Sequence, residues 1–184
     1  TLQILLYMRS SEERVFISLD LESPNLNAKL PNNVSWFNVQ EIKNNFIERN
    51  LNKLILSFNN QIPWNEKLNL ENIYKFLNNG NDINILIQDY NFIGWAWQTK
   101  SGIIQDHDLT VKLKPHQIYQ SKWLVDKKFL YNRQNKNLSF AWIQNLKKFY
   151  KKQGFTEGVA YIDSWNKGVL KSCLRSGYKI KNWT

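Results

Sequence analysis

The most constraining feature of this sequence is a run of strand, loop and helix signals between residues 118 and 178. An apolar strand is expected over Ile118–Val125, followed by a polar, basic loop over Lys127–Asn137. A periodic helix is expected from Leu138 to about Gln153, and a second strand over Gly158–Asp163. A strand that leads through a loop into a helix N-terminus presents backbone donors and the positive end of a dipole. The run therefore predicts an anion site at the start of the helix.

Two segments of this run resemble motifs of the GNAT acetyltransferase superfamily. The segment Gln134 to Ser139 is similar to that family's coenzyme A pyrophosphate loop, (Gln/Arg)-x-x-Gly-x-(Gly/Ala). The segment Asn166 to Tyr178 resembles the family's closing motif. In that motif an Asn is followed by a small apolar residue three positions on, often by a Tyr seven positions on, and then by Gly-Phe. The resemblance covers about the last third of the chain well and the preceding hairpin loosely.

This sequence departs from the family pattern in the loop and in the last helix. Asn137 and Ser139 replace the loop glycines, and Cys173 stands where the family often has a Tyr. The stretch between Val125 and Gln134 is also a few residues longer than usual. Because Asn tolerates left-handed backbone angles better than most residues, we expect Asn137 to have a left-handed or otherwise unusual conformation.

The resemblance implies an α/β (α+β) fold with a central mixed, mostly antiparallel twisted sheet flanked by helices on both faces. It implies one GNAT-like domain over residues 1–184, with the recognisable core in residues 82–184 and a divergent region in residues 1–60. Family chains usually add another strand after the closing Gly-Phe, whereas only Lys179 to Thr184 follow here, enough for one short strand. We therefore expect the N-terminal strands to occupy the vacant edge of the sheet.

The remaining elements are predicted from hydrophobic periodicity and turn residues. In chain order they are strands at Leu2–Met8 and Arg14–Leu21, a strand or loop at Val34–Val39, helices at Gln40–Phe58 and Leu70–Leu77, and a hairpin over Asp82–Lys100 that turns at Asp89-Tyr90-Asn91. Along the Leu138 helix, one face is expected in the core: Leu138, Ala141, Trp142, Leu146, Phe149 and Tyr150. Its lysines are assigned to solvent: Lys147, Lys148, Lys151 and Lys152.

The composition narrows the partners and the compartment. A net charge of +10 favours a polyanionic partner such as coenzyme A phosphates, a nucleotide-sugar or nucleic acid, although a lysine-rich surface also serves solubility alone. One cysteine and two histidines offer no metal-ligand spacing, and a single cysteine suits a reducing, cytoplasmic setting. No apolar run approaches 18 residues, so no membrane span is predicted. We expect a cytoplasmic, bacterial-type protein that is a monomer or homodimer and needs no metal.

The resemblance implies that acetyl-CoA, or another acyl-CoA, binds as co-substrate. The residues implied as its contacts are Leu124, Val125, Arg133, Gln134, Asn135, Lys136, Asn137, Leu138, Ser139 and Asn166. Asn166 is also expected to cap the last helix. The alternative for the loop is an ordinary polar connection before an amphipathic helix.

Two residues are candidates for proton transfer during catalysis. Cys173 is a candidate acid for the departing thiolate, and Asp163, at the end of a strand, is a candidate base. The alternative for Cys173 is packing, since it falls in the apolar pattern of its helix. His107, between two aspartates, is either a base with a carboxylate partner or part of an exposed turn.

Three functions remain open at this point. The leading one is a CoA-dependent N-acyltransferase acting on a small amine, and a negatively charged acceptor such as an amino-sugar nucleotide would suit the net charge. The second is a GNAT-fold binding module that has lost catalysis. The third is a transferase or binder that uses tRNA or another polyanion, which is less favoured because the basic residues are not gathered with aromatics in a recognisable RNA motif.

Overall fold

A computed structural model of the chain describes residues 14–41, 51–53, 55–56, 59–60, 69–100, 102–106, 109–130, 137–164 and 166–181. The strands are β1 (Arg14–Asp20), β2 (Val34–Asn38), β3 (Asp82–Gln88), β4 (Asn91–Thr99), β5 (Ile103–Asp106), β6 (Leu109–Lys112), β7 (Gln117–Val125), β8 (Glu157–Asp163) and β9 (Lys179–Ile180). The helices are a 3-10 turn, η1 (Val39–Glu41), and α3 (Leu70–Asn78), α4 (Lys127–Leu130), α5 (Leu138–Lys152) and α6 (Lys167–Arg175). Residues 51–53, 55–56 and 59 are also helical.

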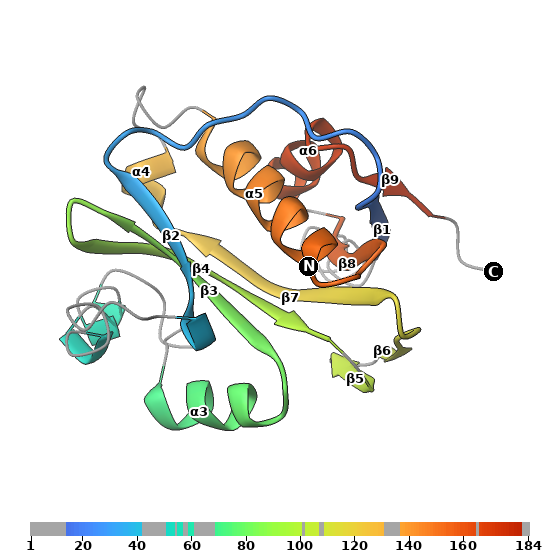
Figure 1. The fold of residues 1–184 in the computed structure, drawn as a ribbon, viewed down its shortest axis with the longest axis horizontal. Coiled ribbons are helices and arrows are strands. Elements are labelled where there is room, and N and C mark those ends of the chain that lie inside the picture. Colours follow the sequence, from blue (N-terminus) through green and yellow to red (C-terminus); the bar gives the residue numbers. More distant parts are fainter. Residues whose placement is uncertain are drawn as a thin grey trace, which may run out of the picture.

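A seven-stranded sheet in the order β2-β3-β4-β7-β8-β1-β9 forms the centre of the molecule (Figure 1). Only β7 and β8 run parallel, and the other neighbouring strands are antiparallel. Helices α5 and α6 lie together on one face, α3 lies on the other, and the β5–β6 hairpin extends from one end (Figure 1). The predicted mixed, mostly antiparallel sheet with helices on both faces is confirmed.

The strand β1 extends the sheet next to β8, as expected of an N-terminal strand, but the edge itself is formed by β9. β1 pairs antiparallel with the whole of β8, from Arg14 opposite Asp163 to Asp20 opposite Glu157. The short strand β9 pairs with β1 in turn, with Ile180 opposite Ile17. The other predicted N-terminal strand, Leu2–Met8, lies outside the described residues.

The predicted hairpin is present as β3 and β4. Asp89 and Tyr90 both have positive φ angles, 47° and 64°, which is the backbone of a tight two-residue turn that matches the twist of its strands. The alternating isoleucines Ile83, Ile85 and Ile87 pack toward α3 with Trp95 and Trp97, and Leu86 packs toward α5. The sheet therefore separates two hydrophobic cores.

Helix α5 covers the centre of one face with the side predicted from its periodicity. Leu138, Ala141, Trp142, Leu146 and Tyr150 are buried, and Phe149 is partly buried against them. Helix α3 also forms as predicted, with Ile73 buried against the opposite core.

The assignment of Lys147 to solvent is wrong. Only 3% of this residue is exposed, and its ammonium donates hydrogen bonds to Ser23 Oγ at 2.6 Å and to Pro24 O at 3.3 Å. Those partners belong to the link between β1 and β2, which crosses α5 (Figure 1). Gln144 accepts a hydrogen bond from the Leu26 N–H at 3.0 Å, and Lys151 pairs with Glu22 at 2.9 Å. The lysines of α5 thus hold this link in place rather than all facing water.

The structure corrects one further expectation, the loop Lys127–Asn137, and describes only part of another, the helix Gln40–Phe58. The predicted loop Lys127–Asn137 begins with a helical turn, α4, because the Asp126 carboxylate accepts a 2.9 Å hydrogen bond from the Lys128 N–H and caps it. Residues 131–136 lie outside the described residues. The predicted helix Gln40–Phe58 is helical where the structure describes it beyond residue 50, and its first turn belongs to η1.

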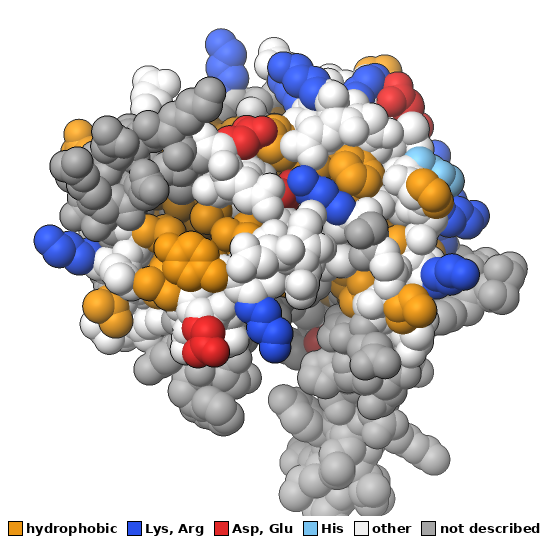
Figure 2. Space-filling model, turned by 60° about the horizontal axis from the view of Figure 1, so that its bottom comes forward, with side chains coloured by type: hydrophobic (Ala, Val, Ile, Leu, Met, Phe, Trp, Pro, Cys, Tyr) orange, Lys and Arg blue, Asp and Glu red, His pale blue; other side chains and the backbone are white. Residues whose placement is uncertain are grey.

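Figure 2 shows the molecule turned so that the lower part of Figure 1 comes forward. On this face Lys and Arg side chains are spread singly among polar and hydrophobic ones and do not gather in one patch. Within the described part of the chain, no helix is long and apolar enough to cross a bilayer.

Candidate functional site

The parallel strands β7 and β8 separate soon after they meet. They pair only over Gln117–Tyr119 and Glu157–Val159, so that Tyr119 opposite Val159 is the last pair. Beyond that pair β7 continues along β4 to Val125, while β8 continues along β1 to Asp163. The two facing strand edges therefore open into a V, with their backbone groups available to a ligand between them.

A bulge in β7 lies immediately beyond the point where the strands part. Lys122 pairs with Trp97 but Gln120 pairs with Gln98, so that Ser121 is the extra residue. Because side chains alternate along a strand, one extra residue moves the following ones to the opposite faces. Trp123 and Val125 accordingly pack toward α5, and Leu124 packs toward α3. The bulge sets which side chains line the V.

The N-terminus of α5 lies over the open end of this V. Trp123 of β7 packs against Trp142 of α5 with ring centroids 4.3 Å apart and planes tilted by 45°, and Val125 shares a core cluster with Leu138. The Ala141 N–H donates to the Asn137 carbonyl at 2.8 Å. The N–H groups of the first helical turn, which come before Ala141, therefore have no acceptor within the helix. The Asn137 side chain makes no capping hydrogen bond to them. These amides and the helix dipole are suited to an anionic group.

Asn137 does not adopt the left-handed backbone that we expected as one of two alternatives. Its φ and ψ angles are −113° and 15°, in the sparsely populated bridge region, so only the alternative of an otherwise unusual conformation holds. Among the described residues other than glycine, only Asp89 and Tyr90 have positive φ. A glycine is therefore not needed at position 137 for backbone reasons.

The structure brings part of the predicted acyl-CoA set together. Leu124 and Val125 end β7, and Asn137, Leu138 and Ser139 stand at the start of α5; Val125 and Leu138 share one core cluster, whereas Leu124 packs on the opposite face of the sheet. Arg133, Gln134, Asn135 and Lys136 lie outside the described residues and remain predictions.

Asn166 caps α6 as predicted. Its Oδ1 accepts a hydrogen bond from the Val169 N–H at 3.3 Å, and its own N–H donates to the Asp163 carbonyl at 2.9 Å. Asn166 is thus fixed at the end of β8, the arm of the V opposite β7. Its contact with a ligand remains a prediction.

Cys173 lies in the core face of α6. Only 8% of the residue is exposed, and burial raises the pKa of its thiol from an ordinary value of 9.0 to about 12. A coenzyme A thiolate is an alkyl thiolate, whose conjugate acid has a pKa of about 8.5. Proton transfer from Cys173 to such a thiolate is therefore uphill, which favours the packing alternative.

Asp163 ends β8 and is partly exposed. Its Oδ1 lies 3.4 Å from Nε of Arg14, the residue opposite it on β1. A base role for Asp163 remains a prediction that has to compete with this ion pair. His107 lies outside the described residues, and among those described no group of His, Cys, Asp and Glu side chains could hold a metal ion.

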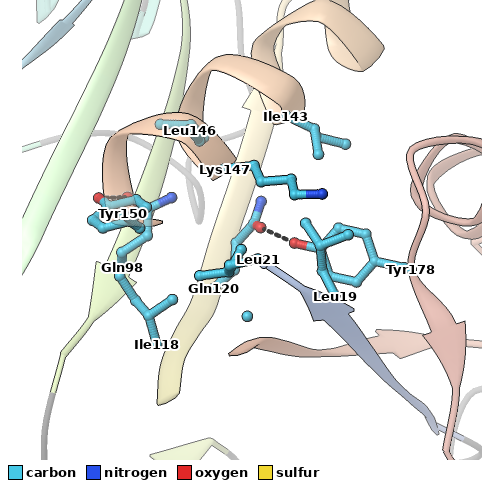
Figure 3. Close-up of a pocket in the computed structure, with 11 residues that line it drawn as sticks. Leu19, Leu21, Gln98, Ile118, Gln120, Ile143, Leu146, Lys147, Tyr150 and Tyr178 are labelled. Atoms are coloured by element: carbon cyan, nitrogen blue, oxygen red, sulfur yellow. Dashed lines mark hydrogen bonds between the residues drawn. The ribbon is translucent and has the colours of Figure 1, made fainter. Parts of the chain in front are cut away.

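Sequence reasoning missed a set of buried polar residues between α5 and the sheet. Asn84 donates to Gln98 Oε1 at 2.6 Å and to the Tyr150 hydroxyl at 2.7 Å, and Tyr150 donates to Gln98 Oε1 at 3.2 Å. Across a small cavity, Tyr178 donates to Gln120 Oε1 at 2.9 Å (Figure 3). The signal for one of these residues was present, because Gly177-Tyr178 stands where the family pattern has Gly-Phe.

Comparison with known proteins identifies the fold. No family model and no curated protein matches this sequence. A GCN5-related N-acetyltransferase from Sphaerobacter thermophilus is similar in structure, with a TM-score of 0.60, 10% identity, and coverage of 97% of this chain and 53% of the other. An aminoglycoside acetyltransferase from an uncultured soil metagenomic sample has a TM-score of 0.57, 13% identity, and coverage of 85% and 95%.

A third similar structure is a tandem GNAT protein from the clavulanic acid biosynthesis pathway. Its TM-score is 0.57 at 10% identity, and the match covers 91% of this chain and 50% of the tandem protein. The chain thus spans about half the length of the first and third of these structures. The fold is that of the GNAT acetyltransferases, and the resemblance found in the sequence is confirmed at this level.

Proposed function

We propose that this chain, which has the GNAT acetyltransferase fold, is a CoA-dependent N-acyltransferase that moves an acyl group, acetyl in the simplest case, from acyl-CoA to an amine. The observation that supports this most is the V between β7 and β8, which has the N-terminus of α5 over its open end. We further propose that residues 82–184 carry the recognisable core of a single acyltransferase domain.

The N-terminus of α5 suits the pyrophosphate of acyl-CoA, and the free strand edge of the V suits its pantetheine arm. The pyrophosphate is an anion, and the first-turn amides of α5 with the loop of residues 133–136 would bind it. The pantetheine arm carries amide groups, and the strand edge beyond Tyr119 offers backbone donors and acceptors that β8 does not use. The acyl group would then lie near the apex of the V, next to the bulge at Ser121.

The chain's contribution to catalysis is then mainly to bind and orient the two substrates. Holding a nucleophile and an acyl group in register accounts for a large part of many rate accelerations. In the proposal the neutral amine attacks the thioester carbonyl, and the departing thiolate takes its proton from solvent or from the acceptor. Cys173 packs α6, because its buried thiol is a poorer acid than the thiol that it would have to protonate.

The acceptor in this proposal is a small amine that carries negative charge, such as an amino-sugar nucleotide. The net charge of +10 supports an anionic acceptor and opposes a polycationic one. Lysines near the groove between the β1–β2 link, β2 and α5, namely Lys29 and Lys148, are candidates to meet such a charge.

The second candidate is a GNAT-fold module that binds acyl-CoA without turnover. The observations that favour it are the burial of Cys173 and the ion pair that occupies Asp163. The two functions differ in one measurement: free thiol released from acetyl-CoA in the presence of amine acceptors.

The test is an assay of thiol release with acetyl-CoA and matched pairs of amines, each with and without a phosphate. Release that depends on amine and is faster for the phosphorylated member supports the enzyme and its acceptor class. Acetyl-CoA binding with no release for any amine supports the binding module. The absence of both binding and release would reject the proposed function.

A further inference from the structure

We propose that the cavity between α5 and the sheet is a binding site for one ordered water molecule that joins two separate polar networks of the core. The inference goes beyond the proposed function and does not depend on it. The cavity is lined by Leu19, Leu21, Gln98, Ile118, Gln120, Ile143, Leu146, Lys147, Tyr150, Gly158 and Tyr178 (Figure 3).

The size of the cavity fits a single water. Its volume is about 20 Å³, and a cavity of about 10–15 Å³ by the same measure is the least that holds a water molecule. Two water molecules or an organic ligand would need more room. A lining of aliphatic groups alone would stay dry, so the polar atoms decide the occupant.

One buried donor in the wall needs a partner. Gln98 is 2% exposed, and its Oε1 already accepts from Asn84 and Tyr150. Its Nε2 is buried and has no hydrogen-bond partner within the described part of the chain. In Figure 3 this nitrogen points away from the Tyr150 hydroxyl, toward the side on which Gln120 lies. A buried N–H without a partner costs about 1–3 kcal/mol, so a partner in the cavity would stabilise the fold.

The other polar groups supply the rest of a water's coordination. Gln120 accepts from Tyr178 through Oε1, so its amide nitrogen remains as a second donor. The Tyr178 hydroxyl donates to Gln120 and keeps a lone pair to accept with, whereas the Tyr150 hydroxyl already donates to Gln98 and accepts from Asn84. Two donors, on Gln98 and Gln120, and one acceptor, on Tyr178, supply the roughly three hydrogen bonds that a buried water typically makes.

The hydrogen-bond donors and acceptors in the cavity wall argue against a small anion as the occupant. A buried anion needs donors only, and both phenol hydrogens are already used by Gln98 and Gln120. The one charged group in the wall, Lys147, directs its ammonium to Ser23 Oγ and Pro24 O, which do not line the cavity. Water, which can accept from the two amide nitrogens and donate to Tyr178, is therefore the occupant that fits the wall.

The water would connect two networks that otherwise end at the cavity. On one side, Asn38, Asn84, Gln98 and Tyr150 form a buried chain of hydrogen bonds from β2 to α5. On the other, Tyr178 holds Gln120, the first residue of β7 beyond its last pair with β8. A bridging water thus fixes Gln120 beside the bulge at which the V opens.

A crystal structure of the wild-type chain that resolves ordered water tests the site directly, with a second crystal soaked in bromide. The expected result is one density peak in the cavity within hydrogen-bond distance of Gln98 Nε2 and at least one of Gln120, Tyr150 and Tyr178, with no anomalous bromide signal. An empty cavity, or bromide in it, would overturn the proposal.

A substitution that fills the cavity should lower Tm if water is bound there and raise Tm if the cavity is empty. A Cβ on Gly158 would make ordinary contacts of 3.7 Å with Leu19 and Leu21 and would take space from the cavity. If water is bound, Gly158→Ala displaces it and strands the Gln98 donor, so Tm falls by about 2–6 °C. If the cavity is dry, the added methyl fills a void and stiffens the unfolded chain, so Tm rises by about 1–4 °C.

Two controls separate the water from other effects of the methyl group. Gly168→Ala adds a Cβ with nothing within 4 Å and reports the change in backbone entropy alone. In a Gln98→Met background the stranded donor no longer exists, so Gly158→Ala should cease to lower Tm. A fall in Tm of the same size in both backgrounds would contradict the proposal.

Discussion

The hydroxyl of Tyr178 donates a 2.9 Å hydrogen bond to Oε1 of Gln120 and so joins the segment after α6 to β7 across the core. Gln120 follows directly on Tyr119, the last residue of β7 that pairs with β8. Tyr178 is 6% exposed, and burial raises the pKa of its phenol well above the usual value. The phenol therefore stays protonated at neutral pH and acts as a donor.

Tyr178→Phe removes only this donor. We expect the free energy of unfolding to fall by about 1–2 kcal/mol, because the partly buried Gln120 side chain loses its partner. For a chain of this size Tm should fall by about 2–8 °C. Tyr74→Phe is the matched control, since Tyr74 is 56% exposed, and it should leave Tm unchanged. Equal Tm values for wild type and Tyr178→Phe would show that the bond adds nothing.

Gly94 allows β4 to lie close to the end of β7. A Cβ at this position would lie 2.7 Å from the Leu124 carbonyl oxygen and 3.2 Å from Val125 Cγ2. Gly94→Ala should therefore force the end of β7 away and destabilise the fold by about 1–3 kcal/mol in urea denaturation. It should also weaken acetyl-CoA binding, whereas Gly168→Ala, in helix α6, should raise stability by about 0.4–1 kcal/mol and leave binding unchanged. Wild-type stability for Gly94→Ala would mean that β7 can shift at no cost.

Substitutions of Asn137 should change the stability of α5 and the affinity for acetyl-CoA in different ways. Asn137→Asp places a negative charge, favourable to the dipole, at the N-terminus of α5, so stability should rise by about 0.3–1 kcal/mol. The same charge should repel the pyrophosphate and raise the Kd for acetyl-CoA about tenfold, or about 1.4 kcal/mol. Asn137→Ser, which adds no charge, should keep the affinity. If calorimetry gave the same Kd for the Asp and Ser variants, the phosphates would not lie at this helix end.

Cys173 should make stability depend on alkaline pH. Burial raises the pKa of its thiol from 9.0 to about 12, so the folded state keeps a proton that the unfolded state loses above about pH 9. This contribution is complete below pH 9 and is lost between about pH 9 and 12. The wild type should therefore lose about 1.4 kcal/mol more than Cys173→Ala between pH 7 and pH 10. Parallel pH curves for the two proteins, from urea denaturation, would show that the thiol titrates normally.

The main elements could be predicted because their signals are local. Leu138–Lys152 shows helical periodicity, and Asp82–Thr99 alternates around residues that tolerate a tight turn. The place of β1 between β8 and the edge strand β9 depends on pairing between distant segments, which no local signal fixes.

The missed features depend on contacts between distant parts of the chain. Lys147 looks like a surface residue of an amphipathic helix, and only the β1–β2 link that crosses α5 buries it. The bulge at Ser121 depends on the register of β7 against β4, which alternation alone does not fix. Gln98 and Gln120 read as ordinary polar strand residues until that register brings them to one cavity.

The central claim is that the V between β7 and β8, with α5 at its open end, binds acyl-CoA. The most direct measurement is the thermal unfolding of the chain at low salt with acetyl-CoA, CoA and a polyanion as control. Acetyl-CoA at about 100 times its Kd should stabilise the fold by about 2.7 kcal/mol. That corresponds to a rise in Tm of about 5–10 °C, which the polyanion should not reproduce. No shift at millimolar acetyl-CoA, or an equal shift with the polyanion, would contradict the account.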